Sequence, residues 1–414
     1  MLSISNNVTL HKNNSQFLKT PNSASAIFDG TNDYIDASTL SSSIDKESGT
    51  ISHWAKITAS ANNEVLFSCS AGTSGEDKVQ TVFMTSTSSG QFQAVYKAGG
   101  AAKKAVYNYP AVDIVNAGWF HLAMTYSKVE TEVTIKLYFN GALHNTFTGE
   151  VDTIGEEIVF DRAILGKNAN ADNSYLTGSM DEFAYYNRVL TADEILRIYN
   201  AKGTFDCIAQ VDVDAAPESL KQWLRFGDGA NDFEQDQTTA IMDMSNNALG
   251  GDVIVNGDFS TSGSITTSSH TLGWSRGGSG DTGSSIESNQ LVLSRPEGED
   301  HDHARIYASD GSSGRNVKPS NHQGKIFRLQ LDIVARTNSA NLQYFTGGAY
   351  ANLPDSTVGT KVVYFVSDNT QLFVMKMNTE GATMTIDNVS LKEVQGNPAF
   401  TSGALINQDD NPTA

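Results

Sequence analysis

Apolar and polar residues alternate over many short segments of this chain, which is the pattern of β-strands with one buried face. Two strong examples are residues 119–126 and 133–139, and the second ends in Asn140-Gly141, a typical hairpin turn. Further segments follow at intervals of about 8–12 residues, separated by Gly, Asn, Asp and Ser. The pattern predicts an all-β protein built from two antiparallel jelly-roll sandwiches.

One segment has helical spacing instead. Thr191-Ala192-Asp193-Glu194 forms a capping box, in which the Thr hydroxyl and the Glu carboxylate each accept from free amides. Ile195, Ile198 and Tyr199 then define an apolar face, and Gly203 is a stop signal. We expect one short capped helix that closes the first sandwich.

The same pattern divides the chain into five parts. Sandwiches are predicted over 24–203 and 251–395, joined by an acidic connector over 204–250 that is aromatic enough to pack against a neighbouring module. Residues 1–23 form a polar arm, suited either to adding a strand to a neighbouring molecule or to a frayed end. Residues 396–414 are expected to form a polar tail.

Charge narrows the range of partners. The chain carries 28 Lys+Arg against 47 Asp+Glu, a net charge of −19, with no basic stripe. This composition argues against nucleic acid and anionic membranes as partners and favours cation binding. No apolar run approaches the roughly 20 residues of a membrane span, and the first residues lack a signal-peptide pattern. Cys69 and Cys207 are expected to be two buried free thiols.

The first predicted sandwich resembles the laminin-G-like family of concanavalin A-like jelly rolls. The resemblance rests on Phe28-Asp29-Gly30, Asp33-Tyr34-Ile35, Trp54, Trp119–Ala123, Tyr138–Gly141, Leu165-Gly166, Gly178–Glu182 and the closing helix. It implies the fold but no particular ligand, because the family includes lectin-like, adhesive and purely structural members. We interpret Trp54 and Trp119 as structural residues.

The second predicted sandwich resembles the β-jelly-roll carbohydrate-binding modules of xylanases and glucanases. Asn256-Gly257-Asp258-Phe259, Gly273-Trp274 and Ile386–Leu391 carry the resemblance. It implies a structural calcium between the opening turn and the closing strand, where Asp387 matches the family aspartate. Ser260 departs from the acidic residue that often follows the Phe. Tandem modules of these two kinds are similar to virion proteins of tailed bacteriophages, such as tail fibres, adhesins and head decorations.

Sugar sites stack an aromatic ring on the apolar face of a sugar and add hydrogen bonds from amide, acid or guanidinium groups. In the second module, residues of these types are Trp274, Arg305, Tyr307, Gln343, Tyr344 and Tyr350. They are the predicted carbohydrate-binding residues. For Trp274 a place in the core is an equally good interpretation.

Carboxylates suggest hard-cation sites, since calcium takes several oxygen ligands. The candidate calcium ligands are Asp29, Asp172, Asp181, Asp258 and Asp387. The alternative for each is an aspartate that caps a turn. His301-Asp302-His303 offers zinc-compatible groups, but the pattern better fits a charged turn before a strand.

Glucanase catalysis needs two carboxyl groups about 5–5.5 Å apart on one strand face. Glu150 and Asp152 share a face if the chain is extended, but Glu156 follows four residues after Asp152, and Gly155 would break a strand. The segment favours a solvated acidic loop, so we predict that the protein is not an enzyme.

These observations predict a non-enzymatic phage virion component, either a surface decoration or a fibre-type receptor-binding protein located at the virion surface. Weak contacts to a host glycan, repeated over many copies of a homo-oligomer, would supply avidity. Two alternatives stay open. One is a bacterial extracellular adhesin or carbohydrate-binding protein at the cell surface. The other is a purely structural capsid or tail decoration without a glycan site.

Overall fold

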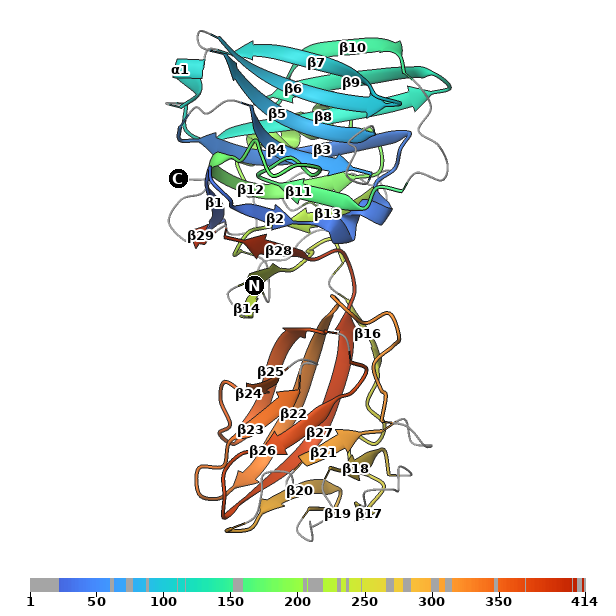
Figure 1. The fold of residues 1–414 in the computed structure, drawn as a ribbon, viewed down its shortest axis with the longest axis vertical. Helices are drawn as coiled ribbons and strands as arrows, with labels where there is room; N and C mark the ends of the chain where they lie inside the picture. The colour runs from blue at the N-terminus through green and yellow to red at the C-terminus, as the bar shows by residue number, and fades with distance from the viewer. Residues whose placement is uncertain are drawn as a thin grey trace, which may run out of the picture. The chain divides into compact units, whose positions relative to one another are not determined.

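The chain folds into two units, each built from two antiparallel sheets over a hydrophobic core, in a computed structural model (Figure 1). One unit spans Met1–Asn247 and Gly396–Ala414, and the other spans Ala248–Gln395. The structure describes residues 22–412 except 60–62, 72–76, 87–88, 110, 116, 152–158, 204–206, 208–218, 229–231, 236–237, 247, 266–271, 278–283, 299–304, 310–314, 346–348, 369, 404 and 408–411.

The first unit contains an eight-stranded and a nine-stranded sheet. The eight-stranded sheet has the order β10 (Ala142–Glu150), β9 (Glu132–Phe139), β8 (Phe120–Val129), β3 (Ser48–Ile57), β12 (Thr177–Tyr186), β1 (Ser25–Asp29) and β29 (Leu405–Asn407), with β13 (Leu220–Leu224) also paired to β12. The nine-stranded sheet has the order β14 (Phe233–Gln235), β15 (Thr238–Ile241), β28 (Ala399–Ser402), β2 (Tyr34–Asp36), β11 (Arg162–Leu165), β4 (Glu64–Ser70), β5 (Lys78–Ser86), β6 (Ser89–Ala98) and β7 (Ala101–Tyr109).

The core of the first unit lies between these two sheets. Phe67 and Phe92 come from the nine-stranded sheet, and Phe120 and Phe183 come from the eight-stranded one. The ring centroids of Phe67 and Phe183 are 5.0 Å apart, as are those of Phe92 and Phe120. Strand alternation places these rings on the inner faces, so the core forms as the sequence pattern predicts.

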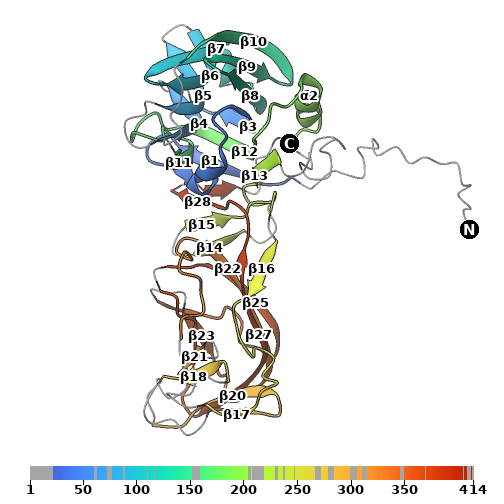
Figure 2. The same ribbon diagram turned by 90° about the vertical axis from the view of Figure 1, so that its right-hand side faces the viewer.

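The predicted closing helix is present as α2 (Ala192–Asn200), beside β10 in Figure 2. Glu194 N donates to Thr191 Oγ1 over 3.3 Å, and Thr191 N donates to Glu194 Oε2 over 2.7 Å, which completes the capping box. Ile195 and Ile198 are buried in a small cluster with Tyr138 and Tyr186. The other short helices are α1 (Ala111–Ile114) and a 3₁₀ helix over Ser38–Ser43. Among the described residues, no helix is both long and apolar enough to span a membrane.

The chain leaves the first unit and returns to it, which changes the predicted division. The sequence predicts a connector over 204–250 and a tail over 396–414, whereas both segments supply strands to the first unit. From the connector, β13 pairs with β12, and from the tail, β28 pairs with both β15 and β2. Hairpin and neighbour rules do not reveal such pairings, because the partner strands are far away in sequence. The second unit is thus inserted between β15 and β28.

The second unit contains a seven-stranded and a five-stranded sheet. The seven-stranded sheet has the order β17 (Gly263–Ser264), β19 (Ser285–Glu287), β20 (Gln290–Arg295), β27 (Ala382–Val394), β22 (Ile326–Arg336) and β25 (Gly359–Val366), with β16 (Leu249–Asp252) paired to β27. The five-stranded sheet has the order β18 (Trp274–Arg276), β21 (Arg305–Ala308), β26 (Val374–Met377), β23 (Leu342–Phe345) and β24 (Tyr350–Asn352). The predicted all-β sandwich class is confirmed.

Two smaller predictions concern the chain end and the thiols. Of the arm predicted over 1–23, residues 1–21 lie outside the described part. Asn22 is buried and donates to Asp181 Oδ2 over 2.7 Å and to Glu182 Oε1 over 3.0 Å.

Cys69 and Cys207 are buried free cysteines, as predicted. Burial raises the pKa of the Cys69 thiol well above its usual value, so this thiol is inert.

Candidate functional site

The five-stranded sheet of the second unit presents an unusual set of side chains on the face turned away from the core. Ile306, Leu342 and Met375 belong to the core, so the residues that alternate with them point the other way. We call this surface the polar face of the five-stranded sheet. Its members are Ser275, Arg305, Tyr307, Gln343, Phe345, Tyr350, Asn352, Val374 and Lys376. Ser275, Val374 and Lys376 are buried, and the other members are partly or fully exposed.

One row of this face is polar. Arg305 pairs with Lys376 across β21 and β26, Lys376 pairs with Gln343 across β26 and β23, and Gln343 pairs with Asn352 across β23 and β24. Directly opposite residues have Cβ atoms about 4.5–5.5 Å apart, so the four side chains form a continuous line. Gln343 Nε2 donates to Asn352 Oδ1 over 2.9 Å. The row offers donors to hydroxyl and carboxylate oxygens alike.

The neighbouring row is aromatic. Tyr307 pairs with Ser275 on one side, and Phe345 pairs with Tyr350 on the other. The ring centroids of Phe345 and Tyr350 are 5.2 Å apart at an interplanar angle of 52°. Lys376 Nζ lies 4.1 Å from the centroid of the Tyr350 ring, which links the two rows by a cation–π contact.

Arg315 reaches this face from outside the sheet. Its guanidinium carbon lies 4.3 Å from the centroid of Tyr307, and that of Arg305 lies 5.7 Å from the same ring. Arg315 Nε donates to Ser275 Oγ over 3.0 Å, and its Nη2 donates to the Arg276 carbonyl over 2.9 Å. These bonds fix the guanidinium over the Tyr307 ring. A ligand that stacks on Tyr307 must take the other ring face or displace Arg315.

Gly277 keeps the edge of this face open. A Cβ atom at this position would lie 2.6 Å from Arg305 Nε and 3.0 Å from Tyr307 Cε2. Any side chain here would therefore push both residues away from their places. Because Gly277 N donates to the Arg305 carbonyl over 2.8 Å, the backbone on both sides is held in register.

Aromatic rings beside amides and cations suit a saccharide, which has both apolar C–H faces and hydroxyl groups. Arg305, Arg315 and Lys376 add three cationic groups to this face. Hydroxyls, and acidic substituents in particular, would find charged donors here.

The structure brings together four of the six predicted carbohydrate-binding residues, namely Arg305, Tyr307, Gln343 and Tyr350. The other two belong to the core: for Trp274 this is the alternative interpretation of the sequence, and for Tyr344 it corrects the predicted role. Trp274 is fully buried, lies 5.5 Å from Phe259 between ring centroids, and donates its indole N–H to the Asn256 carbonyl over 3.0 Å. Tyr344 is buried on the inner face of β23, and burial raises its pKa.

Sequence reasoning missed Arg315, Lys376, Phe345 and Asn352. The alternation Val374-Met375-Lys376-Met377 is a signal that could have identified Lys376, since a lysine between two core methionines must face outward. Arg315 lies outside the regular strands, and no periodicity indicates where it points.

The candidate calcium ligands of the first unit bind protein groups. Asp29 Oδ1 accepts from Thr31 N over 2.7 Å, which is a turn cap. Asp172 forms an exposed ion pair with Lys167 at 2.6 Å, and this pair lowers its pKa. Asp181 is fully buried and accepts from Asn22 and from Glu182 N.

The two candidates of the second unit occupy neighbouring segments. Asp258 Oδ1 accepts from Ser260 N and Oγ, while Asp387 Oδ1 accepts from Asn388 N over 2.8 Å. The two segments meet where Val389 N donates to the Gly257 carbonyl over 2.8 Å. Within the described part of the chain, no group of three or more His, Cys, Asp or Glu side chains is arranged to hold a metal ion.

Two other sequence candidates fall on parts that cannot be described. Asp152 and Glu156 lie outside the described residues, and Glu150 is exposed at the end of β10. His301-Asp302-His303 also lies outside them. Trp54 is buried, stacked on Tyr199 with ring centroids 5.8 Å apart, in line with its predicted structural role.

These sandwiches define an all-β protein of the kind found among binding modules. Residues 29–196 match the Laminin_G_3 family, described as the concanavalin A-like lectin/glucanases superfamily, which confirms the predicted concanavalin A-like domain in the first unit. The match covers less than half of the chain. No curated protein matches the sequence.

Several solved structures are similar in fold. The CBM40 of the Ruminococcus gnavus IT-sialidase has 20% identity and a TM-score of 0.34, over 44% of this chain and 97% of that one. The heptameric SAP-like pentraxin of Limulus polyphemus has 14% identity and a TM-score of 0.32, over 45% and 82%. The NanB sialidase of Streptococcus pneumoniae has 15% identity and a TM-score of 0.33, over 81% and 46%.

Proposed function

We propose that this chain is a non-enzymatic carbohydrate-binding protein that holds a saccharide on the polar face of the five-stranded sheet. The observation that carries the proposal is the alignment of an aromatic row, with Tyr307 and Tyr350, beside a row of charged and amide donors, with Arg305, Lys376 and Gln343. The rings would contact the apolar side of a sugar, and the donors would bind its hydroxyl groups. The lectin-type family of the first unit is consistent with this function.

A glycan array on the full chain, followed by titration of the best ligand, tests the proposal. Tyr350→Ala should weaken binding about tenfold, because removal of an aromatic anchor typically costs that much or more. Tyr364→Ala is a matched control, since Tyr364 is also partly buried but lies on β25 of the other sheet. Equal losses in both variants, or an array without any binding, would refute the proposed site and favour a purely structural role.

The location of the protein is proposed from the fold and the family match. Neither the fold nor the family match supports the virion role expected from the architecture, so we favour the alternative, an extracellular or cell-surface carbohydrate-binding protein. Absence of catalysis is part of this proposal. Incubation with β-glucans and a reducing-end assay test it, and released oligosaccharide would contradict it.

Avidity through self-association and a structural calcium complete the proposal. An arm at residues 1–23 that adds a strand to a second copy would produce a homo-oligomer, which light scattering on the full chain and on a chain lacking that arm detects.

Calcium would bind near Asp258 and Asp387, where the opening turn and the closing strand meet. A rise in melting temperature on adding calcium, absent in Asp387→Asn, is the expected result.

A further inference from the structure

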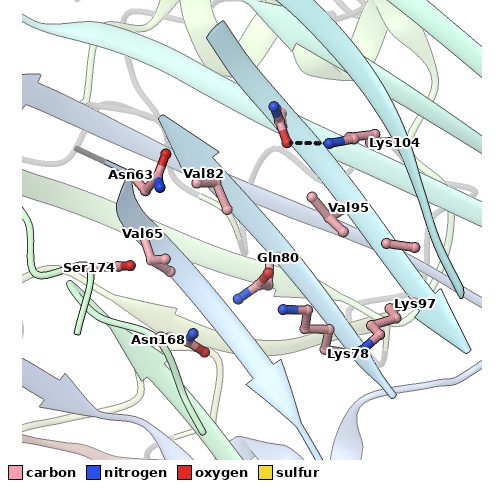
Figure 3. A pocket seen from close by; sticks show the side chains of 12 residues that line it. Asn63, Val65, Lys78, Gln80, Val82, Val95, Lys97, Lys104, Asn168 and Ser174 are labelled. Carbon is pink, nitrogen blue, oxygen red and sulfur yellow. Dashed lines mark hydrogen bonds between the residues drawn. The ribbon is translucent and has the colours of Figure 1, made fainter. Parts of the chain in front are cut away.

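The first unit contains a pocket of about 320 Å³ on the outer face of its nine-stranded sheet (Figure 3). Side chains of β4, β5, β6 and β7 form its floor, and Asn168 and Ser174 come from the segment between β11 and β12. This pocket is separate from the polar face of the five-stranded sheet, which belongs to the other unit.

Strand alternation explains which residues line the pocket. On β5, Val79 faces the core, while Lys78, Gln80 and Val82 face outward. On β6, Phe92, Ala94 and Tyr96 face the core, while Gln93, Val95 and Lys97 line the pocket. The register places Gln80 opposite Val95, Val82 opposite Gln93, and Lys78 opposite Lys97.

Three lysines surround the floor. Lys78 and Lys97 are direct cross-strand partners, and Lys104 of β7 pairs with Val95, next to them. Like charges directly opposite each other destabilise a sheet. Burial and the neighbouring Lys97 both lower the pKa of Lys78. Among the described lining residues none is Asp or Glu, although the whole chain has 47 acidic residues against 28 basic ones. An anionic ligand would find three ammonium groups here.

The rest of the floor combines apolar and amide groups. Val65, Val82 and Val95 form a small buried cluster of their own. Gln80 lies near Lys78 and Val65 in Figure 3, and Lys104 Nζ donates to Gln93 Oε1 over 3.4 Å. Valines suit the C–H face of a sugar ring, and carboxamides bind hydroxyl groups by both donating and accepting.

We propose that this pocket is a second binding site, for a saccharide that carries carboxylate or sulfate groups. The lysines bind the acidic groups, the carboxamides bind hydroxyls, and the valines contact the sugar ring. A nucleic acid fits less well, because no aromatic side chain lines the described pocket and base stacking is the main sequence-tolerant contact to single strands.

Four probes separate the possible ligands on the full chain: polygalacturonate as a carboxylated polysaccharide, dextran sulfate as a sulfated one, neutral dextran, and a single-stranded DNA. We expect binding of polygalacturonate, dextran sulfate or both, weakening with salt, and much weaker binding of dextran and DNA. Comparison of the first two identifies the acidic group.

Charge-removing variants locate the site. The double variant Lys78→Gln, Lys97→Gln should weaken polyanionic saccharide binding at least about tenfold, as expected for lost charge-assisted contacts. Lys103→Gln is the matched control, because Lys103 precedes Lys104 on β7 but is not among the pocket residues and pairs with core-facing Tyr96. This control should bind within about twofold of the parent.

The melting temperature of each variant shows whether a loss of binding results from unfolding. The double variant changes two side chains on the outer face of the sheet, so its melting temperature should stay within a few degrees of that of the parent. Equal losses in Lys103→Gln, preference for DNA, binding of dextran as tight as of its sulfate, or no binding of any probe would each overturn the proposal. Loss of acidic-saccharide binding in Tyr350→Ala but not in the double lysine variant would place that ligand on the polar face of the other unit and overturn the pocket, so the two proposed sites succeed or fail separately.

Discussion

The Arg225 guanidinium and the Glu182 carboxylate form an ion pair, with Nε 2.9 Å from Oε1 and both side chains only 6% exposed. Trp223 adds a hydrogen bond from its indole N–H to Glu182 Oε2 over 2.6 Å, and Asn22 donates to Oε1. The pair joins β12 to the segment that follows β13. It therefore fixes part of the acidic connector predicted over 204–250 onto the first sandwich.

Glu182→Gln should strongly destabilise the first unit. Removing the Glu182 charge takes this counter-ion from the buried Arg225, which costs up to about 3–5 kcal/mol, or roughly 10 °C in melting temperature for a unit of this size. Burial raises the pKa of Glu182 itself, so relief of its own desolvation offsets part of this cost. Differential scanning calorimetry measures the shift. Lys325→Gln, which breaks the more exposed pair with Glu393, is the control and should change stability by at most about 1 kcal/mol. Similar shifts in both variants would show that burial of the Arg225 pair does not matter.

Asp181→Asn should have the opposite effect at neutral pH. Burial and the adjacent Glu182 raise the pKa of Asp181 well above its usual value. A raised folded-state pKa gives stability that is complete below the unfolded value near 3.8 and is lost as the pH rises. Asparagine removes the charge that must otherwise be neutralised, so the variant should melt higher than the parent at pH 7. The gain should vanish near pH 4, and a variant less stable at both pH values would contradict this account.

His53 and His121 should make the first unit sensitive to acid. Both are fully buried, and burial lowers the pKa of each imidazole to about 3. A lowered histidine pKa gives stability that is present above the unfolded value of 6.5 and is lost as the pH falls toward 3. At pH 5 the loss is on the order of 2 kcal/mol per histidine. Asp243, whose pKa burial raises to about 6, works against this loss.

Urea unfolding at pH 7 and pH 5 checks this sensitivity. Ser52 Oγ contacts His121 Nε2 at 2.9 Å, and Thr81 Oγ1 contacts His53 Nε2 at 3.1 Å, so both rings sit in defined polar contacts. In His121→Gln the absolute stability should fall, but the difference between the two pH values should shrink by about the share of one histidine. An unchanged difference would mean that His121 is already protonated at pH 5.

The fold follows from the sequence as far as local patterns reach. Alternation and turn residues suffice to predict the strands of both sandwiches, and the Thr191–Glu194 capping box suffices for α2. Pairings between distant segments do not follow from any local pattern. β28 is a short strand between β15 and β2, and nothing in Ala399–Ser402 indicates a partner more than 150 residues earlier.

The candidate site is predictable only in part, for a similar reason. Residue types point to Arg305, Tyr307, Gln343 and Tyr350. Tyr344 is an equally suitable residue type for a sugar site, but it faces the core, whereas its neighbour Gln343 faces away from it. A one-residue uncertainty in strand register exchanges the two faces, so the sequence cannot assign them separately. The pocket of the first unit depends on the register of four neighbouring strands, β4 to β7, which no local sequence pattern provides.

Removing residues 396–414 should unfold the first unit selectively. The truncation deletes β28 and β29, together with Asn397, whose N–H donates to Asp243 Oδ2 over 2.7 Å in the buried interior. The second unit has its own core, so a chain consisting of 248–395 should melt cooperatively. Calorimetry of the truncated chain should then show only the transition of that fragment. A truncated chain that retains both transitions would mean that the returning strands contribute little.

Gly277→Ala should impair saccharide binding while leaving the fold intact. The three atoms nearest to the added Cβ belong to the side chains of Arg305 and Tyr307, which can move aside at little cost to stability. Both then leave the positions from which they would contact a ligand, so affinity should fall about tenfold with a shift of only a few degrees in melting temperature. Gly257→Ala provides the contrast, because its Cβ would lie 1.9 Å from the rigid Val389 carbonyl oxygen and should destabilise the second unit. If Gly277→Ala binds as tightly as the parent, then the positions of Arg305 and Tyr307 do not determine affinity, and the ligand site must lie elsewhere in the chain.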